Sequence, residues 1–194
     1  MKNFLVVLAG VFYACGAVAG ISDLPSGKYE LDSDHGYILF SYSHLGFSRP
    51  HVSFRKFEVD LDLDAANPNN SKLEVTIDAS SIDSQSDEFN DHLNGENFFD
   101  TKKFPTITFR ATNIKSQGDK GTVTGDLTIK GVTKQVTLDV VINKAANHPM
   151  RKIPNIGLAA TTTVDRRDFG LDEAVPFVGA EITISIDVEL PKAN

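Results

Sequence analysis

The chain has 194 residues, a formal net charge of −7, 13 phenylalanines, one cysteine and no tryptophan. An acidic chain without a basic cluster is a poor candidate for nucleic-acid binding, because neutralisation of phosphates by lysine and arginine supplies most of that affinity, and we exclude nucleic acid as a partner. The length fits one domain.

The first 19 residues have the pattern of a secretory signal peptide. Lys2 precedes an apolar run from Phe4 to about Val18, which is shorter than the ~20 residues that a membrane span needs. The triplet Ala17-Val18-Ala19 fits the small-x-small rule of signal peptidase. We therefore expect cleavage after Ala19 and a mature domain of residues 20–194 without stable membrane insertion.

The only cysteine, Cys15, lies in this leader. An alternative interpretation, a lipoprotein acylated at Cys15, is disfavoured because Phe12-Tyr13-Ala14 matches the small-residue processing box poorly. After cleavage the mature chain has no thiol, no disulfide and no cysteine ligand for a metal. Its stability must then come from a hydrophobic core.

Apolar residues recur with a period of two through most of the mature chain. Residues 73–79 alternate apolar and polar side chains, and the same pattern returns in residues 107–111, 123–129, 136–142 and 182–190. This pattern predicts strands with one buried and one exposed face. Because strands do not alternate with helices, the sequence predicts an antiparallel all-β fold.

Two short segments predict how the strands are bent and joined. The apolar phase slips between Phe54 and Phe57, which predicts a bulge near Arg55-Lys56 of the kind that helps a sheet close into a barrel. Residues 130–133 are short enough to connect two strands as a hairpin.

One segment lacks the period of two. Phe89, Leu93 and Asn97 are spaced as on one face of a helix, and Ser86 is placed to cap it, so we predict a short helix over residues 86–95. The adjacent Phe98 and Phe99 would point to opposite faces of a strand. A helix and turn crossing the mouth of a barrel can direct both rings inward.

Catalytic and metal-binding patterns find no support. The five histidines show no HExxH spacing, there is no Gly-x-Ser-x-Gly elbow, and the mature chain has no cysteine nucleophile. We assign no catalytic residue and no metal ligand, and we expect no enzyme activity. Two alternatives stay open: a haem or metal site formed by His35, His44, His51 or His92, and an enzyme that acts on a hydrophobic substrate.

The feature of the sequence that favours ligand binding is its aromatic content, since phenylalanines are spread over almost the whole mature chain. A barrel of roughly eight strands can fill its own interior or enclose one small ligand, and the pattern alone does not distinguish these two outcomes.

Four ordered motifs identify the chain as similar to the YceI-like family of bacterial periplasmic, lipocalin-like proteins that bind polyisoprenoids. The motifs are Tyr29-x-x-Asp32-x-x-His35, Asp91-His92-Leu93 through Asn97-Phe98-Phe99-Asp100, the stretch from Gly125 to Lys134, and Arg166-Arg167-Asp168-Phe169-Gly170-Leu171. The family commonly has Arg-Asp where this chain has Phe89-Asn90.

The resemblance implies an antiparallel, lipocalin-like barrel of about eight strands, with the helix near its mouth. It implies a periplasmic carrier whose apolar lumen holds a long isoprenoid chain, such as a quinone tail or a polyprenyl phosphate, as a non-covalent ligand and not as a cofactor. A homodimer is left open. The residues expected at the lumen and mouth are Phe40, Tyr42, His44, Phe47, Phe54, His92, Phe98, Phe99, Phe109 and Phe169.

Overall fold

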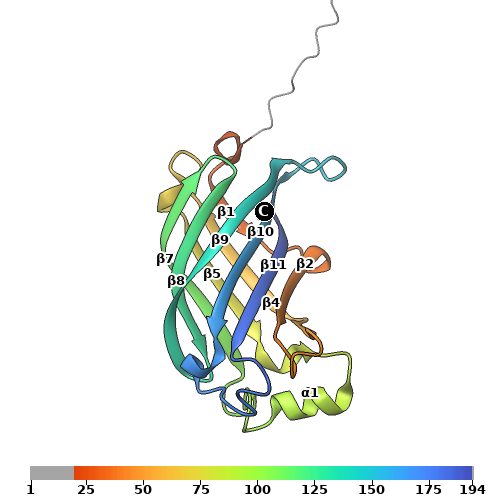
Figure 1. The fold of residues 1–194 in the computed structure, drawn as a ribbon. Helices are drawn as coiled ribbons and strands as arrows, with labels where there is room; N and C mark the ends of the chain where they lie inside the picture. Colours follow the sequence, from red (N-terminus) through yellow and green to blue (C-terminus); the bar gives the residue numbers. More distant parts are fainter. Residues whose placement is uncertain (1–19, 194) are drawn as a thin grey trace, which may run out of the picture.

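The computed structural model describes residues 20–193, so the predicted leader and its cleavage site lie outside the described residues. The described chain forms an eleven-stranded antiparallel sheet that curls around on itself into an elongated barrel (Figure 1). This confirms the all-β, barrel-like fold. Within residues 20–193, no helix is both long and apolar enough to cross a membrane.

The strands differ greatly in length, and the longest run along one side of the barrel. They are β1 (Gly27–Glu30), β2 (Gly36–Ser41), β3 (His51–Phe54), β4 (Phe57–Leu63), β5 (Lys72–Asp78), β6 (Ile82–Asp83), β7 (Thr106–Gln117), β8 (Lys120–Ile129), β9 (Val132–Asn147), β10 (Pro154–Asp165) and β11 (Glu181–Pro191).

The strand count is eleven and not about eight, because three strands are each broken in two. A 3-10 turn, Ser33–His35, separates β1 from β2, and Ala79–Ser81 separates β5 from β6. The break between β3 and β4 falls at Arg55 and Lys56, where the sequence predicts a bulge. The halves keep the same neighbours: β1 pairs with β4 and β2 with β3, while β4 pairs with β5 and β3 with β6.

The sheet closes because β11 pairs with β2 on the side opposite β3. Tyr29 of β1 also forms a bridge to Lys192, beyond the end of β11. The eight segments that result follow one another around the barrel in chain order. Such a meander needs only short connections, and β8 and β9 are joined by the two residues Lys130 and Gly131, as the sequence predicts.

The helix α1 (Asp87–Asn94) crosses the lower end of the barrel in Figure 1. The hydroxyl of Ser86 accepts a hydrogen bond from the Phe89 amide at 3.4 Å, so the predicted cap is confirmed. After Gly95 the chain turns sharply, and the Phe99 amide donates to the Leu93 carbonyl at 3.0 Å. This turn brings the two adjacent phenylalanines beside the barrel end.

Two clusters of apolar side chains divide the interior. The cluster at the end away from α1, which we call the packed end, comprises Leu24, Tyr29, Val59, Leu61, Leu63, Ala65, Ala145, Ile156, Val188 and Leu190. Tyr29, Ile156 and Leu190 have no exposed surface, and the Tyr29 hydroxyl donates to the Pro25 carbonyl at 2.8 Å. The second cluster extends toward α1, and we call this half the open end.

Gly125 in β8 allows a close contact within the open end. A Cβ atom at this position would lie 2.5 Å from the Phe109 ring and 2.5 Å from the Arg110 carbonyl oxygen. The Phe109 ring therefore lies across the glycine of the neighbouring strand, a use of glycine that any side chain would prevent.

We predict that Gly125→Ala lowers the free energy of unfolding by about 1–3 kcal/mol, the usual cost of overpacking. Gly157→Ala is the matched control, because a Cβ in that strand would meet no atom closer than 3.8 Å. Urea denaturation of both variants measures the difference. Equal stabilities would show that the Phe109 contact does not constrain position 125.

Candidate functional site

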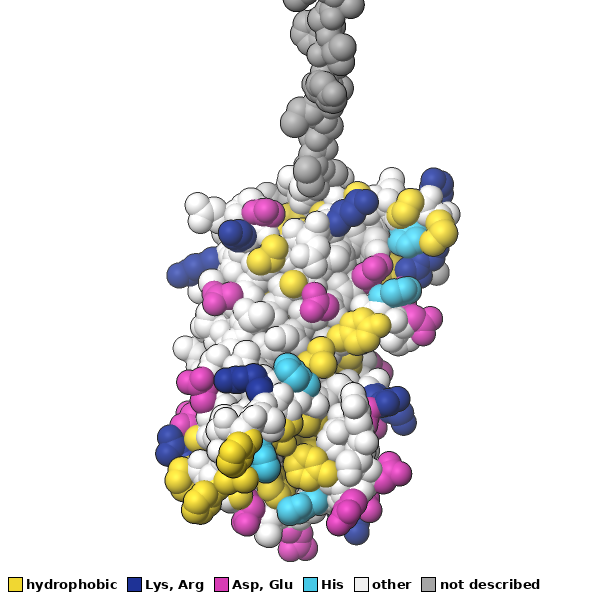
Figure 2. Space-filling view, turned by 45° about the vertical axis from the view of Figure 1, so that its right-hand side comes forward, with side chains coloured by type: hydrophobic (Ala, Val, Ile, Leu, Met, Phe, Trp, Pro, Cys, Tyr) yellow, Lys and Arg dark blue, Asp and Glu magenta, His cyan; other side chains and the backbone are white. Residues whose placement is uncertain are grey.

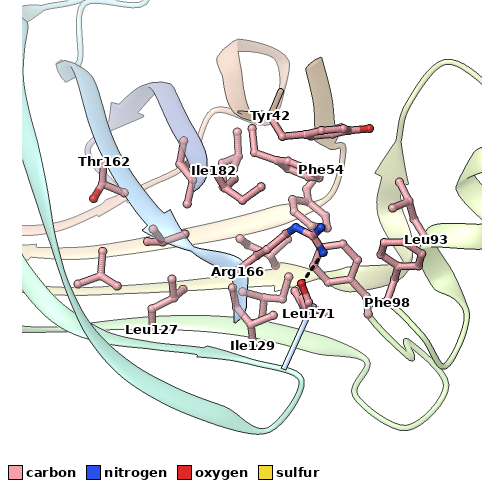
Figure 3. Close-up of a pocket in the computed structure, with 18 of the residues that line it drawn as sticks. Tyr42, Phe54, Leu93, Phe98, Leu127, Ile129, Thr162, Arg166, Leu171 and Ile182 are labelled. Carbon is pink, nitrogen blue, oxygen red and sulfur yellow. Dashed lines mark hydrogen bonds between the residues drawn. The ribbon is translucent and has the colours of Figure 1, made fainter. Parts of the chain in front are cut away.

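A cavity of about 370 Å³ occupies the open end, between the strands and α1 (Figure 3). Its wall is almost wholly apolar and draws on strands from all around the barrel. The aliphatic lining includes Ile38, Val75, Ile77, Leu93, Ile107, Leu127, Ile129, Val136, Leu138, Val164, Leu171, Val178, Ile182, Ile184 and Ile186. Its volume falls within the ~300–1,000 Å³ usual for small-molecule sites.

Aromatic rings form the side of the cavity nearest α1. The Phe54 ring meets the Phe99 ring edge-on at 5.7 Å between centroids, and Phe40 lies 5.8 Å from Phe54. Burial raises the pKa of the Tyr42 hydroxyl, so this side chain is neutral at physiological pH. The rings present hydrocarbon surface and no charge to the cavity.

The cavity is partly open, and the exposed members of its lining locate the opening. His44, His92 and Ala174 line the cavity and are also solvent-exposed. His92 packs edge-on against Phe98 at 4.9 Å between centroids. The mouth therefore lies between α1 on one side and residues 44–48 and 171–178 on the other. At the opposite end, the packed side chains close the barrel.

Among the described residues that line this cavity, Arg166 is the only lysine or arginine. It is buried, and its guanidinium donates to four backbone carbonyls. The distances are 3.0 Å to Gly179, 2.8 Å to Glu173 and 3.1 Å to Val178, and the bond to Leu171 is drawn in Figure 3. Burial lowers the pKa of Arg166, although the charges of Asp172 and Asp165 act in the opposite direction.

Three of the four carbonyls belong to the loop 171–178 that borders the mouth, and the fourth, of Gly179, directly follows it, so Arg166 holds this loop against the barrel. Carbonyl oxygens solvate the cation, and each hydrogen bond to a charged group is worth more than a neutral one. The charged guanidinium of Arg166 therefore mainly stabilises the conformation of the loop at the rim of the cavity.

Eight of the ten expected site residues line the cavity: Phe40, Tyr42, His44, Phe54, His92, Phe98, Phe99 and Phe109. The structure does not place Phe47 or Phe169 on its wall. Phe47 is 91% exposed, because it follows Gly46 in a loop outside the barrel. Phe169 is only 2% exposed, but it lies in the 3-10 turn Arg166–Phe169 and packs within the core.

Several lining residues are absent from that expectation. Phe89 and Leu93 of α1 face the cavity, and their helical spacing could have identified them. The aliphatic wall follows the period of two, but this pattern is the same whether a side chain fills a core or faces a void. Apart from its place in the motif of residues 166–171, nothing in the sequence indicated that Arg166 lines the cavity, since arginine is usually exposed.

The histidines named for a haem or metal site are not brought together within the described residues. His44 and His92 lie at the mouth, and His51 is exposed at the start of β3. His35 forms a group with Asp32 and Glu189, with ligand atoms within 4.8 Å of one another. Arg151 already binds the Asp32 carboxylate there, at 2.5 Å.

Comparison with known proteins agrees with this geometry. The model of the YceI-like domain matches residues 29–190. The chain belongs to the YceI-like family. Protein YceI of Salmonella arizonae is 30% identical over 191 residues, which cover 97% of this chain and 96% of that protein.

Solved structures of other YceI-like family members and fold neighbours are also similar. The Campylobacter jejuni YceI protein has a TM-score of 0.72 and 29% identity, covering 78% of this chain and 90% of its own. Burkholderia cenocepacia BcnA has a TM-score of 0.74 and 24% identity, covering 82% and 98%. A polyisoprenoid binding domain from Saccharophagus degradans has a TM-score of 0.68 and 11% identity, covering 87% and 100%. The last two show the fold alone.

We predict that Arg166→Met destabilises the protein by about 3 kcal/mol or more, because it leaves buried carbonyls without donors. Arg167→Met is the control: this neighbouring arginine is 57% exposed on its side chain, and within residues 20–193 that side chain bonds only to Asp165, so the variant should unfold close to wild type. Urea unfolding compares the two. Similar losses would mean that Arg166 does not hold the loop.

Proposed function

We propose that this protein is a periplasmic carrier that holds a long isoprenoid chain, such as a quinone tail or a polyprenyl phosphate, inside the barrel. The observation that carries the proposal is the apolar cavity, open at the α1 end and closed by packed side chains at the other. A chain can enter it from one side only, and the part of the chain that the cavity encloses is sheltered from water.

The energetics suit a hydrocarbon tail. Burial of each CH₂ group is worth ~0.8 kcal/mol, so one isoprene unit of about five carbons supplies roughly 4 kcal/mol before the cost of ordering the chain. A few units provide a large driving force without a polar contact. The packed end limits how much of the tail can be enclosed, so depth and not hydrogen bonding selects the length.

The head group would lie at the mouth. The groups that border this region with polar atoms are His44, His92, Tyr42 and Arg166. A head group that stays in contact with water does not need a hydrogen bond from any of these side chains. This arrangement favours recognition of the tail over recognition of a particular head.

Family membership and the name of one neighbour support the proposal. The Saccharophagus degradans domain is named as a polyisoprenoid binding domain, and at 11% identity it contributes the fold and no residue-level argument. The periplasmic location rests on the predicted leader sequence, residues 1–19. The near absence of polar groups in the cavity supports binding in preference to catalysis.

Solvent extraction of the mature protein, purified from its native compartment, followed by mass spectrometry, tests the proposal. We expect an isoprenoid at close to one molecule per chain. An extract without any isoprenoid, or with a straight-chain lipid in its place, would contradict it.

A paired substitution links the ligand to the cavity. Ile184→Trp extends a cavity-lining side chain of β11 and should lower the recovered isoprenoid about tenfold or more, since it removes space for several buried carbons. Ser185→Trp, on the adjacent residue that does not line the cavity, should leave the yield unchanged. Equal yields from both variants would place the ligand elsewhere.

A further inference from the structure

Three large apolar side chains project into solvent beside the mouth of the cavity. Leu45 is 50% exposed, Phe47 is 91% exposed and Phe177 is 69% exposed. They lie on two loops, residues 44–48 and 171–178, which we call the mouth loops. Hydrophobic side chains gather at this lower end of the molecule in Figure 2.

The mouth loops are fixed and not merely exposed. The Leu45 amide donates to the Phe177 carbonyl at 2.9 Å, and the Gly179 amide donates to the Ser43 carbonyl at 2.8 Å. His44 also forms a bridge to Val178. From inside the barrel, the Arg166 guanidinium donates hydrogen bonds to backbone carbonyls of the second loop. The backbone therefore presents Leu45 and Phe177 side by side, and both side chains remain at least half exposed.

We propose that the mouth loops dock the protein onto the surface of a lipid bilayer, with Leu45, Phe47 and Phe177 entering its interfacial region. Apolar and aromatic side chains favour this region, where hydrocarbon and water meet. The inference rests on the proposed function, because it supplies the step by which an isoprenoid passes between a membrane and the cavity.

A bilayer is the occupant that the surroundings favour. His44 and Val178 line the cavity while their neighbours Leu45 and Phe177 point outward, so the exposed surface is continuous with the cavity lining. A hydrocarbon that left a bilayer at this point would not cross water. The surface of three side chains on two loops is also small compared with the ~800 Å² that each partner buries in a stable protein interface.

The charges at the mouth predict which bilayer is bound. Arg49 follows the first loop, whereas Asp172 and Glu173 lie on the second, and the whole chain carries −7. Anionic lipid therefore gains no electrostatic advantage, unlike the case of a polybasic surface. Docking should occur on zwitterionic phosphatidylcholine and depend little on salt.

Flotation of the mature protein with phosphatidylcholine vesicles tests the proposal. Wild type should float with the vesicles, and Phe47→Ser combined with Phe177→Ser should reduce the bound fraction about tenfold or more, since two large apolar side chains are removed. Tyr37→Ser combined with Met150→Ser is the matched control. These side chains are 57% and 82% exposed but lie away from the mouth loops, so binding should be retained.

Because the chain has no tryptophan, Phe177→Trp gives a single reporter. Its fluorescence should be quenched by vesicles of brominated phosphatidylcholine, and that of Tyr37→Trp should not. Wild-type protein that stays unbound, or a mouth-loop double variant that floats like wild type, overturns the proposal. So does concentration-dependent self-association that the double variant abolishes, which would assign the surface to a second copy of the chain.

Binding of geranylgeraniol in detergent solution separates this proposal from the proposed function. The mouth-loop double variant should bind this detergent-dispersed probe as wild type does, because Phe47 and Phe177 do not line the cavity. Loss of vesicle docking with retained probe binding supports docking as a distinct step. If the protein docks onto vesicles but binds no isoprenoid, the docking proposal stands and the proposed isoprenoid ligand is wrong.

Discussion

A sheet that closes on itself encloses an interior, and the side chains pointing inward decide whether that interior is solid. In this protein Tyr29, Ile156 and Leu190 fill one end without leaving exposed surface. At the other end the inward-facing side chains leave about 370 Å³ between them, and α1 covers the barrel only in part. The packed half can stabilise the fold, so the open half is free to remain hollow.

The bends in the strands serve this division. The breaks at Ser33–His35, at Arg55-Lys56 and at Ala79–Ser81 occur at corresponding points of three neighbouring strands, so the sheet turns there as a unit. On one side of this line lies the packed end, with β1 and β4, and on the other lie β2, β3 and β6 beside the aromatic rings of the cavity. Arg166 and the mouth loops then complete the rim.

Local patterns predicted the parts of this fold that depend on neighbours in sequence. The alternation in residues 123–129 became β8, the phase slip became the break at Arg55-Lys56, and Ser86 caps α1. The number of strands is eleven and not about eight, because three strands are each broken in two by a bend. Long-range features escaped prediction. Arg166 donates to carbonyls up to 13 residues away, and Phe47 lies outside the barrel on an exposed loop. No sequence pattern distinguishes Leu61, in the packed end, from Leu127, on the cavity wall.

The proposed function requires that the open end encloses a hydrocarbon chain. A crystal structure of the mature protein taken from its native compartment tests it most directly. We expect continuous, branched density running from between His44 and His92 toward the boundary with the packed end. A cavity filled by ordered water, or closed by the rings of Phe40, Phe54 and Phe99, would contradict it.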